Sequence, residues 1–347
     1  MHTPETTHLR GTTLTRSQML TRAVAYVAVG VVLVVLAAAG VGGILLPVML
    51  VVGAVLAFGG VSRLVWALRG SKVDLLPWLC AVWLVVLGLA ALFAPWLPLG
   101  EAHNATVALS EPIYQRPFET ADHVLGTNGA GLDMLGRVIY GARTSLLISL
   151  SAVVIGMTVG GLVGVVAGYY RGGTDRTIGI LTNAVLSVPP LILLVALAAI
   201  LDANARNMAL ALSVLTIPSM VRIARANAIN FAQREFVLAA RALGASRNRI
   251  MLRELVPNVA LPLMSMAMVT ISALIVAESS LSFLGLGIPQ PEPTWGNMIS
   301  EAQAGTTMKD HPFIVLVPGV VLFLTVFSFN LLGEKAQRRW DPRSAKL

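Results

Sequence analysis

Charged residues are scarce in this sequence. Asp, Glu, Lys and Arg make up 12% of the 347 residues, whereas 56% are hydrophobic. A soluble domain is about 25% charged, so the composition excludes a soluble protein of this size and predicts an all-α polytopic membrane protein. The net charge of +8 does not indicate a nucleic-acid partner, because the basic residues are not gathered on one domain among aromatic side chains.

Cysteine and histidine are also scarce. The single cysteine, Cys80, lies in an apolar run, which excludes a disulfide framework and a metal-thiolate site. None of the five histidines has a His, Cys or acidic residue at ligand spacing, so we expect no metal and no cofactor. The chain contains no G-x-x-x-x-G-K-[ST] phosphate loop and no constellation of nucleophile, base and acid. We therefore expect neither an enzyme activity nor ATP hydrolysis by this chain.

Long apolar runs predict eight membrane-spanning helices. A span needs roughly 20 apolar residues, and the first run, residues 23–62, is uncharged over 40 residues. Three glycines and Pro47 lie near its middle, so we predict two helices joined by a tight hairpin. Six further spans are predicted at residues 75–96, 144–168, 178–201, 208–221, 259–288 and 313–332.

The distribution of basic residues predicts the topology. Cytoplasmic loops retain Lys and Arg, and with the N-terminus inside, 20 of the 25 basic residues fall in inner segments. Both termini are therefore predicted to be cytoplasmic. The chain divides into a cytoplasmic tail (1–22), an extra transmembrane hairpin (23–72) and a six-helix core (73–347). The core has predicted external loops at about 97–140 and about 289–312, and a cytoplasmic loop at about 222–258.

That cytoplasmic loop has an amphipathic pattern. Its apolar residues recur at helical spacing with arginines on the other faces, which predicts a helix that breaks near Gly244 and resumes toward Pro257. One interpretation places this helix on the inner leaflet, its arginines on anionic headgroups of the membrane lipid. The other is docking to a second protein, which the small side chains between Ala239 and Ser246 favour because they let another backbone approach closely.

Five blocks resemble, in order, the permease subunits of ABC importers. They are VLGTNGAGLDMLGRVIYGARTSL (124–146), GYYRGGTDRTI (168–178), REFVLAARALGASRNRIMLRELVPN (234–258), ESSLSFLGLGIPQPEPTWGNMISEA (278–302) and FNLLGEKAQRRWDPR (329–343). The chain looks like the C-type permease of dipeptide and oligopeptide importers over about residues 75–347. Its third block looks like the EAA loop of that family.

The resemblance implies a six-helix importer core, to which the N-terminal hairpin is an addition, in a bacterial cytoplasmic membrane. It implies four kinds of partner: a homologous B-type permease, two cytoplasmic ABC ATPase subunits or domains that hydrolyse ATP, an extracytoplasmic peptide-binding protein, and membrane lipid. In this family the EAA loop is a coupling helix that docks in a groove of the ATPase. The ATPase-coupling residues implied here are Arg234, Glu235, Ala239, Ala240, Arg241, Leu243, Gly244, Ala245, Ser246 and Pro257.

The sequence departs from the family pattern in two places. Leu238 occupies the position of the motif's glutamate, which leaves Glu235 as the carboxylate available for a salt bridge to the ATPase. Asn128 and Leu132 stand where the external block usually has an aspartate and an arginine, so that pair is uncharged here.

Three features inside the predicted spans have alternative interpretations. Glu278 is the only acid well inside a span; with Ser279 and Ser282 it is a candidate lining of the translocation path, or it simply reaches water or a cavity near the outer end. The glycines at 156, 160, 164 and 168 form a stripe along one helix face. This stripe serves either ordinary helix packing or a face that slides against the partner permease. Pro189 and Pro190 predict a kink.

The sequence thus predicts a permease subunit of an ATP-driven peptide importer. A nickel or other small-solute importer is the nearest alternative, because related permeases share these blocks. A self-contained secondary transporter would need embedded carboxylates or broken helices to bind a coupling ion, and among the acids only Glu278 qualifies. A membrane receptor or scaffold would not require the external GIPQPEPTWG segment.

Overall fold

The computed structural model describes residues 7–9, 12–14, 21–29, 32, 75–303 and 305–340. The chain divides into two compact units, Met1–Leu79 and Cys80–Leu347. In the first, β1 (Thr7–Leu9) pairs antiparallel with β2 (Thr12–Leu14), with Thr7 opposite Leu14, and residues 21–29 are helical. Most of the predicted hairpin at 23–62 lies outside the described residues.

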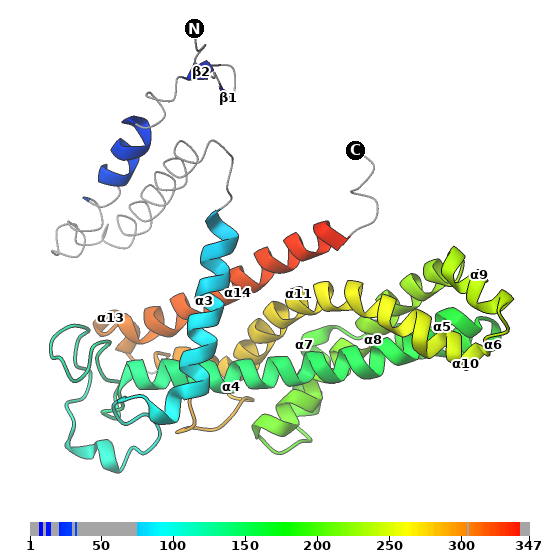
Figure 1. Ribbon diagram of the computed structural model, residues 1–347. Helices are drawn as coiled ribbons and strands as arrows, with labels where there is room; N and C mark the ends of the chain where they lie inside the picture. Colours follow the sequence, from blue (N-terminus) through cyan, green and yellow to red (C-terminus); the bar gives the residue numbers. More distant parts are fainter. Residues whose placement is uncertain are drawn as a thin grey trace, which may run out of the picture. The chain divides into compact units, whose positions relative to one another are not determined.

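Helices make up most of the described chain from residue 75 onward (Figure 1). In chain order they are α3 (Leu75–Phe93), η2 (Ala94–Trp96), η3 (Val107–Ser110), α4 (Met134–Ile155), η4 (Gly156–Gly160), α5 (Gly161–Tyr170), α6 (Gly172–Leu186), α7 (Pro190–Ala198), α8 (Ala205–Phe231), α9 (Glu235–Ala242), α10 (Arg247–Ile250), η5 (Met251–Leu255), α11 (Val256–Phe283), α12 (Trp295–Glu301), α13 (Thr307–Asp310) and α14 (Phe313–Trp340). Of these, η4 and η5 are π-helical turns inside longer helices.

The spanning helices agree in place with the six spans predicted after residue 74. Within the described residues, five helices are long and apolar enough to cross a membrane, or six if the bent pair α6–α7 is one span. Helix α4 begins ten residues before its predicted span because Asp133 caps it, accepting a hydrogen bond from the Gly136 N–H at 2.6 Å. The all-α polytopic membrane fold is confirmed.

The glycine stripe packs inside the subunit, along α8. A Cβ atom on Gly156 would lie 2.6 Å from Thr216 Cβ, and one on Gly164 would lie 2.5 Å from the Val221 carbonyl oxygen. Glycines let two helix backbones approach closely, and here they join the continuous helix α4–η4–α5 to α8. The interpretation as a surface that slides on a partner permease is therefore wrong, and ordinary packing is confirmed.

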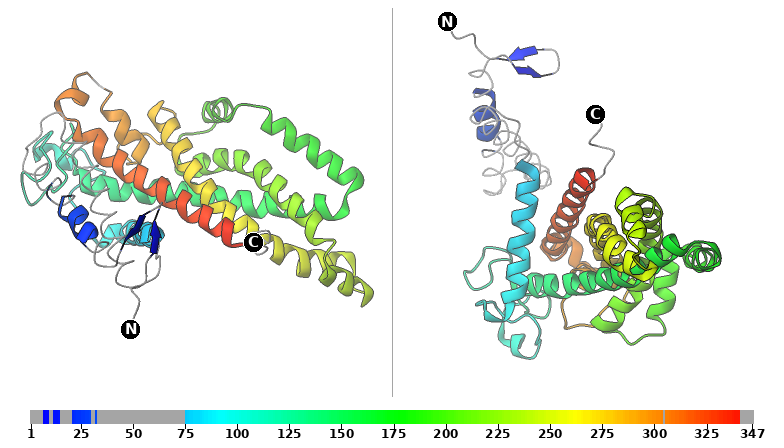
Figure 2. Two further views of the ribbon diagram at one scale, coloured as in Figure 1. Left: turned by 90° about the horizontal axis from the view of Figure 1, so that it is seen from above. Right: turned by 45° about the vertical axis from the view of Figure 1, so that its right-hand side comes forward.

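The two prolines break their span more sharply than a kink. Helices α6 and α7 meet at 82°, with Pro190 in the first turn of α7. Proline lacks the N–H that would continue the hydrogen-bond ladder of α6, and its ring disfavours helical backbone at the preceding residue. No residue of α6 is buried, so this pair lies at the edge of the subunit (Figure 2).

The remaining helices place the two ends of the core. Helix α14 runs beside α11, and the short helix α12 lies against α4, α11 and α14 (Figures 1 and 2). Trp295 of α12 is fully buried, and its indole N–H donates to the Val138 carbonyl of α4 at 3.1 Å. Loops predicted as external therefore meet at one end, while α9 and α10 lie at the other, near the junction of α5 and α6.

Substituting a stripe glycine tests this packing. We expect Gly164→Leu to lower the midpoint of thermal unfolding in detergent, because overpacking costs about 1–3 kcal/mol and here the obstacle is backbone. Gly319→Leu on α14 is the matched control, since no atom lies within 4 Å of a Cβ added there. Equal unfolding midpoints for both variants and the native chain would contradict the close α5–α8 contact.

Candidate functional site

The predicted cytoplasmic loop forms two short helices joined by a tight turn. Helix α9 ends in a Schellman motif: the Ala245 N–H donates to the Ala240 carbonyl and the Gly244 N–H donates to the Arg241 carbonyl, both at 3.0 Å. Gly244 has φ +80°, the left-handed conformation that glycine adopts without steric cost. The predicted break at Gly244 is confirmed, and the conformation explains why a glycine stands there.

Apolar side chains anchor this helix pair to the core. Val237 and Ile250 are fully buried, and they belong to a cluster that includes Val165 of α5 and Met220 of α8. The Tyr170 hydroxyl, at the end of α5, also hydrogen-bonds the Asn248 side chain at 2.6 Å. These contacts connect α9 and α10 to the spanning helices α5 and α8.

The outer face of the pair carries most of the residues predicted for coupling. Within the set predicted from the sequence, Ala240 and Ala245 are half-buried and the others are exposed, namely Arg234, Glu235, Ala239, Arg241, Leu243, Gly244, Ser246 and Pro257. Leu243 is 88% exposed and Leu238, at the position of the family's glutamate, is 51% exposed. Except for Pro257, which lies beyond η5 at the start of α11, the set falls within residues 234–246, which we call the docking segment after its predicted role.

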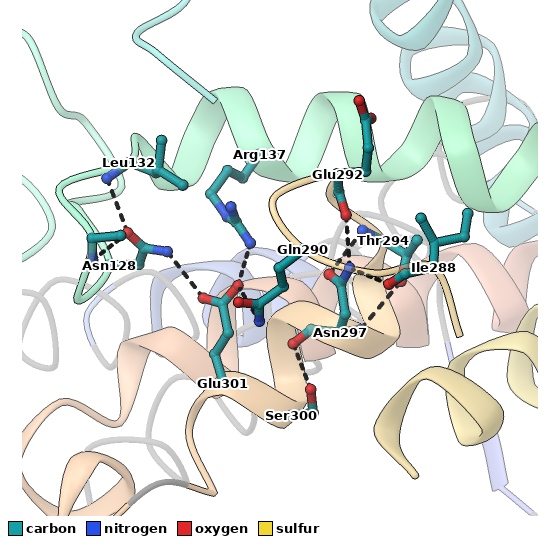
Figure 3. Close-up of polar contacts among 11 residues, drawn as sticks. Asn128, Leu132, Arg137, Ile288, Gln290, Glu292, Thr294, Asn297, Ser300 and Glu301 are labelled. Carbon is teal, nitrogen blue, oxygen red and sulfur yellow. Dashed lines mark hydrogen bonds and ion pairs between the residues drawn. The ribbon is translucent and has the colours of Figure 1, made fainter. Parts of the chain in front are cut away.

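At the opposite end of the core, a buried ion pair joins α4 to α12 (Figure 3). Arg137 is 1% exposed, and its guanidinium pairs with the Glu301 carboxylate. Glu301 also accepts hydrogen bonds from the Asn128 amide at 3.0 Å and from the Gln290 amide at 3.2 Å. Burial raises the pKa of Glu301, and the charge of Arg137 and the Asn128 amide oppose that rise.

Asn128, which stands where the family usually has an aspartate, makes hydrogen bonds that need its neutral amide. Its Oδ1 accepts from the Ala130 and Leu132 N–H groups, at 3.0 and 2.9 Å, while its amide donates to Glu301. An aspartate here would place a second carboxylate beside Glu301 and could not donate. Sequence reasoning missed the Arg137–Glu301 pair, although both residues lie in the quoted blocks, because 164 residues separate them and no spacing rule connects them.

Asn297 fixes the loop that leads into α12 (Figure 3). Its Oδ1 accepts from the Thr294 N–H at 2.9 Å, and Thr294 Oγ1 accepts from the Asn297 N–H at 3.1 Å, which together form a capping box. The Asn297 amide also donates to the Glu292 carbonyl at 2.7 Å. The GIPQPEPTWG segment, predicted to be external, is thus held in a defined conformation.

Glu278 lies in a sealed pocket of hydroxyl groups. It is 0% exposed and accepts hydrogen bonds from Ser145 of α4 at 3.0 Å and from Ser282, one turn later on α11, at 2.8 Å. Thr294 donates in turn to Ser282 at 3.4 Å, which connects α12. The interpretation that Glu278 simply reaches water is wrong in this conformation. A role of Glu278, Ser279 and Ser282 in lining the path stays a prediction.

His123 connects the external loop to the start of α4. It is 7% exposed, and its ring nitrogens lie 3.1 Å from Asp133 Oδ1 and 3.2 Å from Glu111 Oε2. Burial lowers the pKa of His123, but its hydrogen bonds to Asp133 and Glu111 and their charges outweigh burial, so the pKa lies above its ordinary value. Within the described residues, no group of three or more His, Cys, Asp and Glu has a geometry that could hold a metal ion.

The hydroxyl pocket predicts different effects for two substitutions of Glu278. Glu278→Ala leaves Ser145 and Ser282 without their acceptor, and we expect a loss of about 1–3 kcal/mol of stability in thermal unfolding. Glu278→Gln keeps an acceptor oxygen, so it should unfold nearly as the native chain does and transport with unchanged kinetics. Native stability together with a raised KM in Glu278→Gln would instead place this residue on the path.

The raised pKa of His123 predicts that its contribution to stability depends on pH. Because its folded pKa is raised above the ordinary value of about 6.5, its stabilising contribution is complete at lower pH and is lost as the pH rises through the folded value. We expect the unfolding midpoint of the native chain to exceed that of His123→Gln by more at about pH 5.5 than at about pH 9. Parallel pH profiles for the two proteins would rule out this contribution.

Comparison with known proteins identifies the family. The family model described as binding-protein-dependent transport system inner membrane component matches residues 160–345. The dipeptide transport system permease protein DppC of Alkalihalophilus pseudofirmus is 32% identical over 255 residues, covering 74% of this chain and 82% of that protein. The di/tripeptide transport system permease protein DppC of Pseudomonas aeruginosa is 34% identical over 263 residues, covering 76% and 86%.

The glutathione transport system permease protein GsiD of Escherichia coli is also 34% identical over 263 residues, covering 76% of this chain and 85% of that protein. A solved structure of the inward-facing MetNI methionine ABC transporter aligns with a TM-score of 0.47 at 20% identity, covering 59% of this chain and 97% of that one. The extent and identity of the family and sequence matches confirm the resemblance seen in the five blocks. This chain belongs to the family of binding-protein-dependent transport system inner membrane components.

Proposed function

We propose that this chain is one permease subunit of an ABC importer that moves dipeptides and oligopeptides across the bacterial cytoplasmic membrane. The observation that carries the proposal is the docking segment, an exposed helix and turn anchored by buried side chains on the spanning helices. The sequence contains no phosphate loop of its own, so the energy of transport comes from ATPases that this segment contacts.

The docking segment has the chemistry of a protein interface. Exposed Leu238 and Leu243 offer apolar contact, Ala239 and Gly244 let a partner backbone approach, and Glu235 has no ion-pair partner within the described residues. We assign Glu235 the salt bridge to a basic residue of the ATPase. Closure of two ATPases on ATP would push this segment, and the Schellman turn and the buried anchors would carry the displacement into α8 and α11.

The proposal includes two further partners, a second permease and a binding protein. A homologous B-type permease would complete the path with this subunit, and an extracytoplasmic binding protein would deliver the cargo to the outer end, where α12 and the GIPQPEPTWG loop lie. Peptide as cargo is supported by the relatives, whose names specify dipeptide, di/tripeptide and glutathione transport. The permease needs few cargo contacts because the binding protein selects the substrate.

The docking segment is tested with Gly244→Asp. A carboxylate in the interface would be desolvated without a partner, and we expect the ATPases to be lost when the tagged permease is purified in mild detergent, with uptake abolished and membrane insertion intact. A loss of about 2 kcal/mol corresponds to roughly 30-fold in affinity. Gly244→Asn separates charge from backbone strain, because asparagine tolerates the same left-handed conformation; it should retain more ATPase than Gly244→Asp.

Gly305→Asp is the matched control on the external side. Gly305 also has positive φ, +59°, and a Cβ there would meet nothing within 4 Å, so both glycines share conformation and openness. The control should keep its ATPases. Native uptake by Gly244→Asp, or equal loss of ATPases from both variants, would overturn the coupling assignment. Recovery of the unsubstituted chain without any ATPase would count against the importer as a whole.

A further inference from the structure

The break between α6 and α7 falls inside the span predicted at residues 178–201, and the length of α6 predicts how deep in the membrane it lies. Arg176 is the fifth residue of α6, near the end predicted to be cytoplasmic, and Ser187 follows eleven residues later, directly after the helix ends. At 1.5 Å per residue this separation is about 16 Å, roughly half of the ~30 Å hydrocarbon thickness. Non-helical backbone at residues 187–189 is therefore near the middle of the bilayer.

The break leaves backbone carbonyls without donors. Pro190 has no N–H to give to the Leu186 carbonyl, and no backbone N–H within the described residues donates to the Ser187 or Val188 carbonyls. Each unsatisfied group in hydrocarbon costs several kcal/mol, and such backbone is found only where it is buried in protein or lines a water-filled cavity. Residues 187–189 are exposed in this subunit, so the cost of open carbonyls in hydrocarbon requires water or another protein to cover them.

A polar stripe leads from the cytoplasmic end of α6 to this break. Asp175, Gly179, Asn183 and Ser187 recur every four residues, which places them on one face of the helix. The Asn183 side chain is exposed and has no hydrogen-bond partner within the described residues, and no atom lies within 4 Å of a Cβ added to Gly179. An amide that is free of partners at this depth requires water or a polar ligand.

A cavity borders the stripe. About 300 Å³ in volume, it lies between α6 and α8, and Asp175, Gly179 and Asn183 line it. At its cytoplasmic end Asp175 forms a bidentate pair with Arg225, with Arg225 Nη2 2.7 Å from Asp175 Oδ2. Arg222, which also lines the cavity, has no carboxylate partner within the described residues. Because charged side chains favour hydration, we expect water at that end of the cavity.

We propose that this stripe and the open carbonyls of Leu186, Ser187 and Val188 line the aqueous translocation path, and that the Asn183 amide and those carbonyls hydrogen-bond to the backbone of a peptide cargo. Only the peptide contact in this inference rests on the proposed function, which supplies peptide as the cargo. Amide and carbonyl groups can hydrogen-bond to the main chain of any peptide, whatever its side chains. Such groups therefore suit a path for peptides of different sequence. Glu278 and Ser282, by contrast, are enclosed by the chain's own helices.

Cysteine accessibility tests the path. The only cysteine, Cys80, is replaced by serine, and Asn183→Cys and Ser187→Cys are each made in that background. Leu181→Cys and Ile192→Cys are matched controls on the same helix pair, at positions that are 63% and 62% exposed but outside the stripe. The assembled transporter in membrane vesicles is treated with a charged, membrane-impermeant methanethiosulfonate, which reacts with thiolates and therefore with cysteines in water.

We expect the two stripe cysteines to react and the two controls to stay unmodified, with labelling of Asn183→Cys slowed by saturating dipeptide. Equal reactivity at all four positions, or no reactivity at either stripe position with or without ATP, would overturn the path. In the second case the stripe is buried against the partner permease. Reaction without protection by dipeptide keeps the path but rejects the peptide contact, which is the pattern expected if the proposed cargo is wrong.

Uptake kinetics provide the second measurement. Removing one hydrogen bond to cargo with Asn183→Ala should raise the KM for dipeptide uptake roughly 2- to 10-fold, and Asn183→Gln, which keeps the amide, should restore most of it. Leu181→Ala should leave the KM unchanged. A native KM for Asn183→Ala would remove the peptide contact from the proposal.

Discussion

A backbone that crosses hydrocarbon has to satisfy its own hydrogen bonds, and the architecture of this chain depends on that constraint. It explains why the apolar runs after residue 74 are helices and why even the two π-helical turns, η4 and η5, continue the helices around them. It also isolates the single abrupt break among the described spanning helices, at Pro189 and Pro190, where the helix pair bends by 82°. The permitted surroundings for such a break are protein or water.

Close backbone contact gives this helical core its rigidity. The stripe from Gly156 to Gly168 brings η4 and α5 close against α8, because the glycines themselves place no side chain in the contact. Since α8 leads directly into α9, the same contact fixes the cytoplasmic end from which the docking segment projects. In a membrane the hydrophobic effect does not drive helices together, so van der Waals packing at small residues has to supply this contact.

At the end of the core that carries the loops predicted to be external, buried polar groups join the helices. Arg137 with Glu301, and Glu278 with its hydroxyl partners, join α4, α11 and α12 inside a low-dielectric environment. An unpaired charge there would be costly, so each group specifies where its partner must be. The loops predicted to be external are thereby held in one arrangement, whereas most residues of the docking segment, at the opposite end, are exposed.

The sequence by itself determined the fold class, the position of the spanning helices after residue 74, and the family, because apolar run length, charge placement and ordered motifs are local properties of a chain. It also located the helix break at Gly244, since a glycine in the left-handed conformation has a local signature. It placed the start of α4 ten residues late, because a cap such as Asp133 was outweighed by the hydropathy pattern.

Only the tertiary structure decided what depends on distant residues. The partner of Arg137 lies 164 residues away, and the enclosure of Glu278 needs Ser145 from another helix. The direction of the glycine stripe toward α8, and the exposure of the α6 stripe, likewise follow from which helix faces are covered. Periodicity reveals that a helix has distinct faces, but the free energy that selects the partner of each face comes from packing and charge pairing across the whole chain.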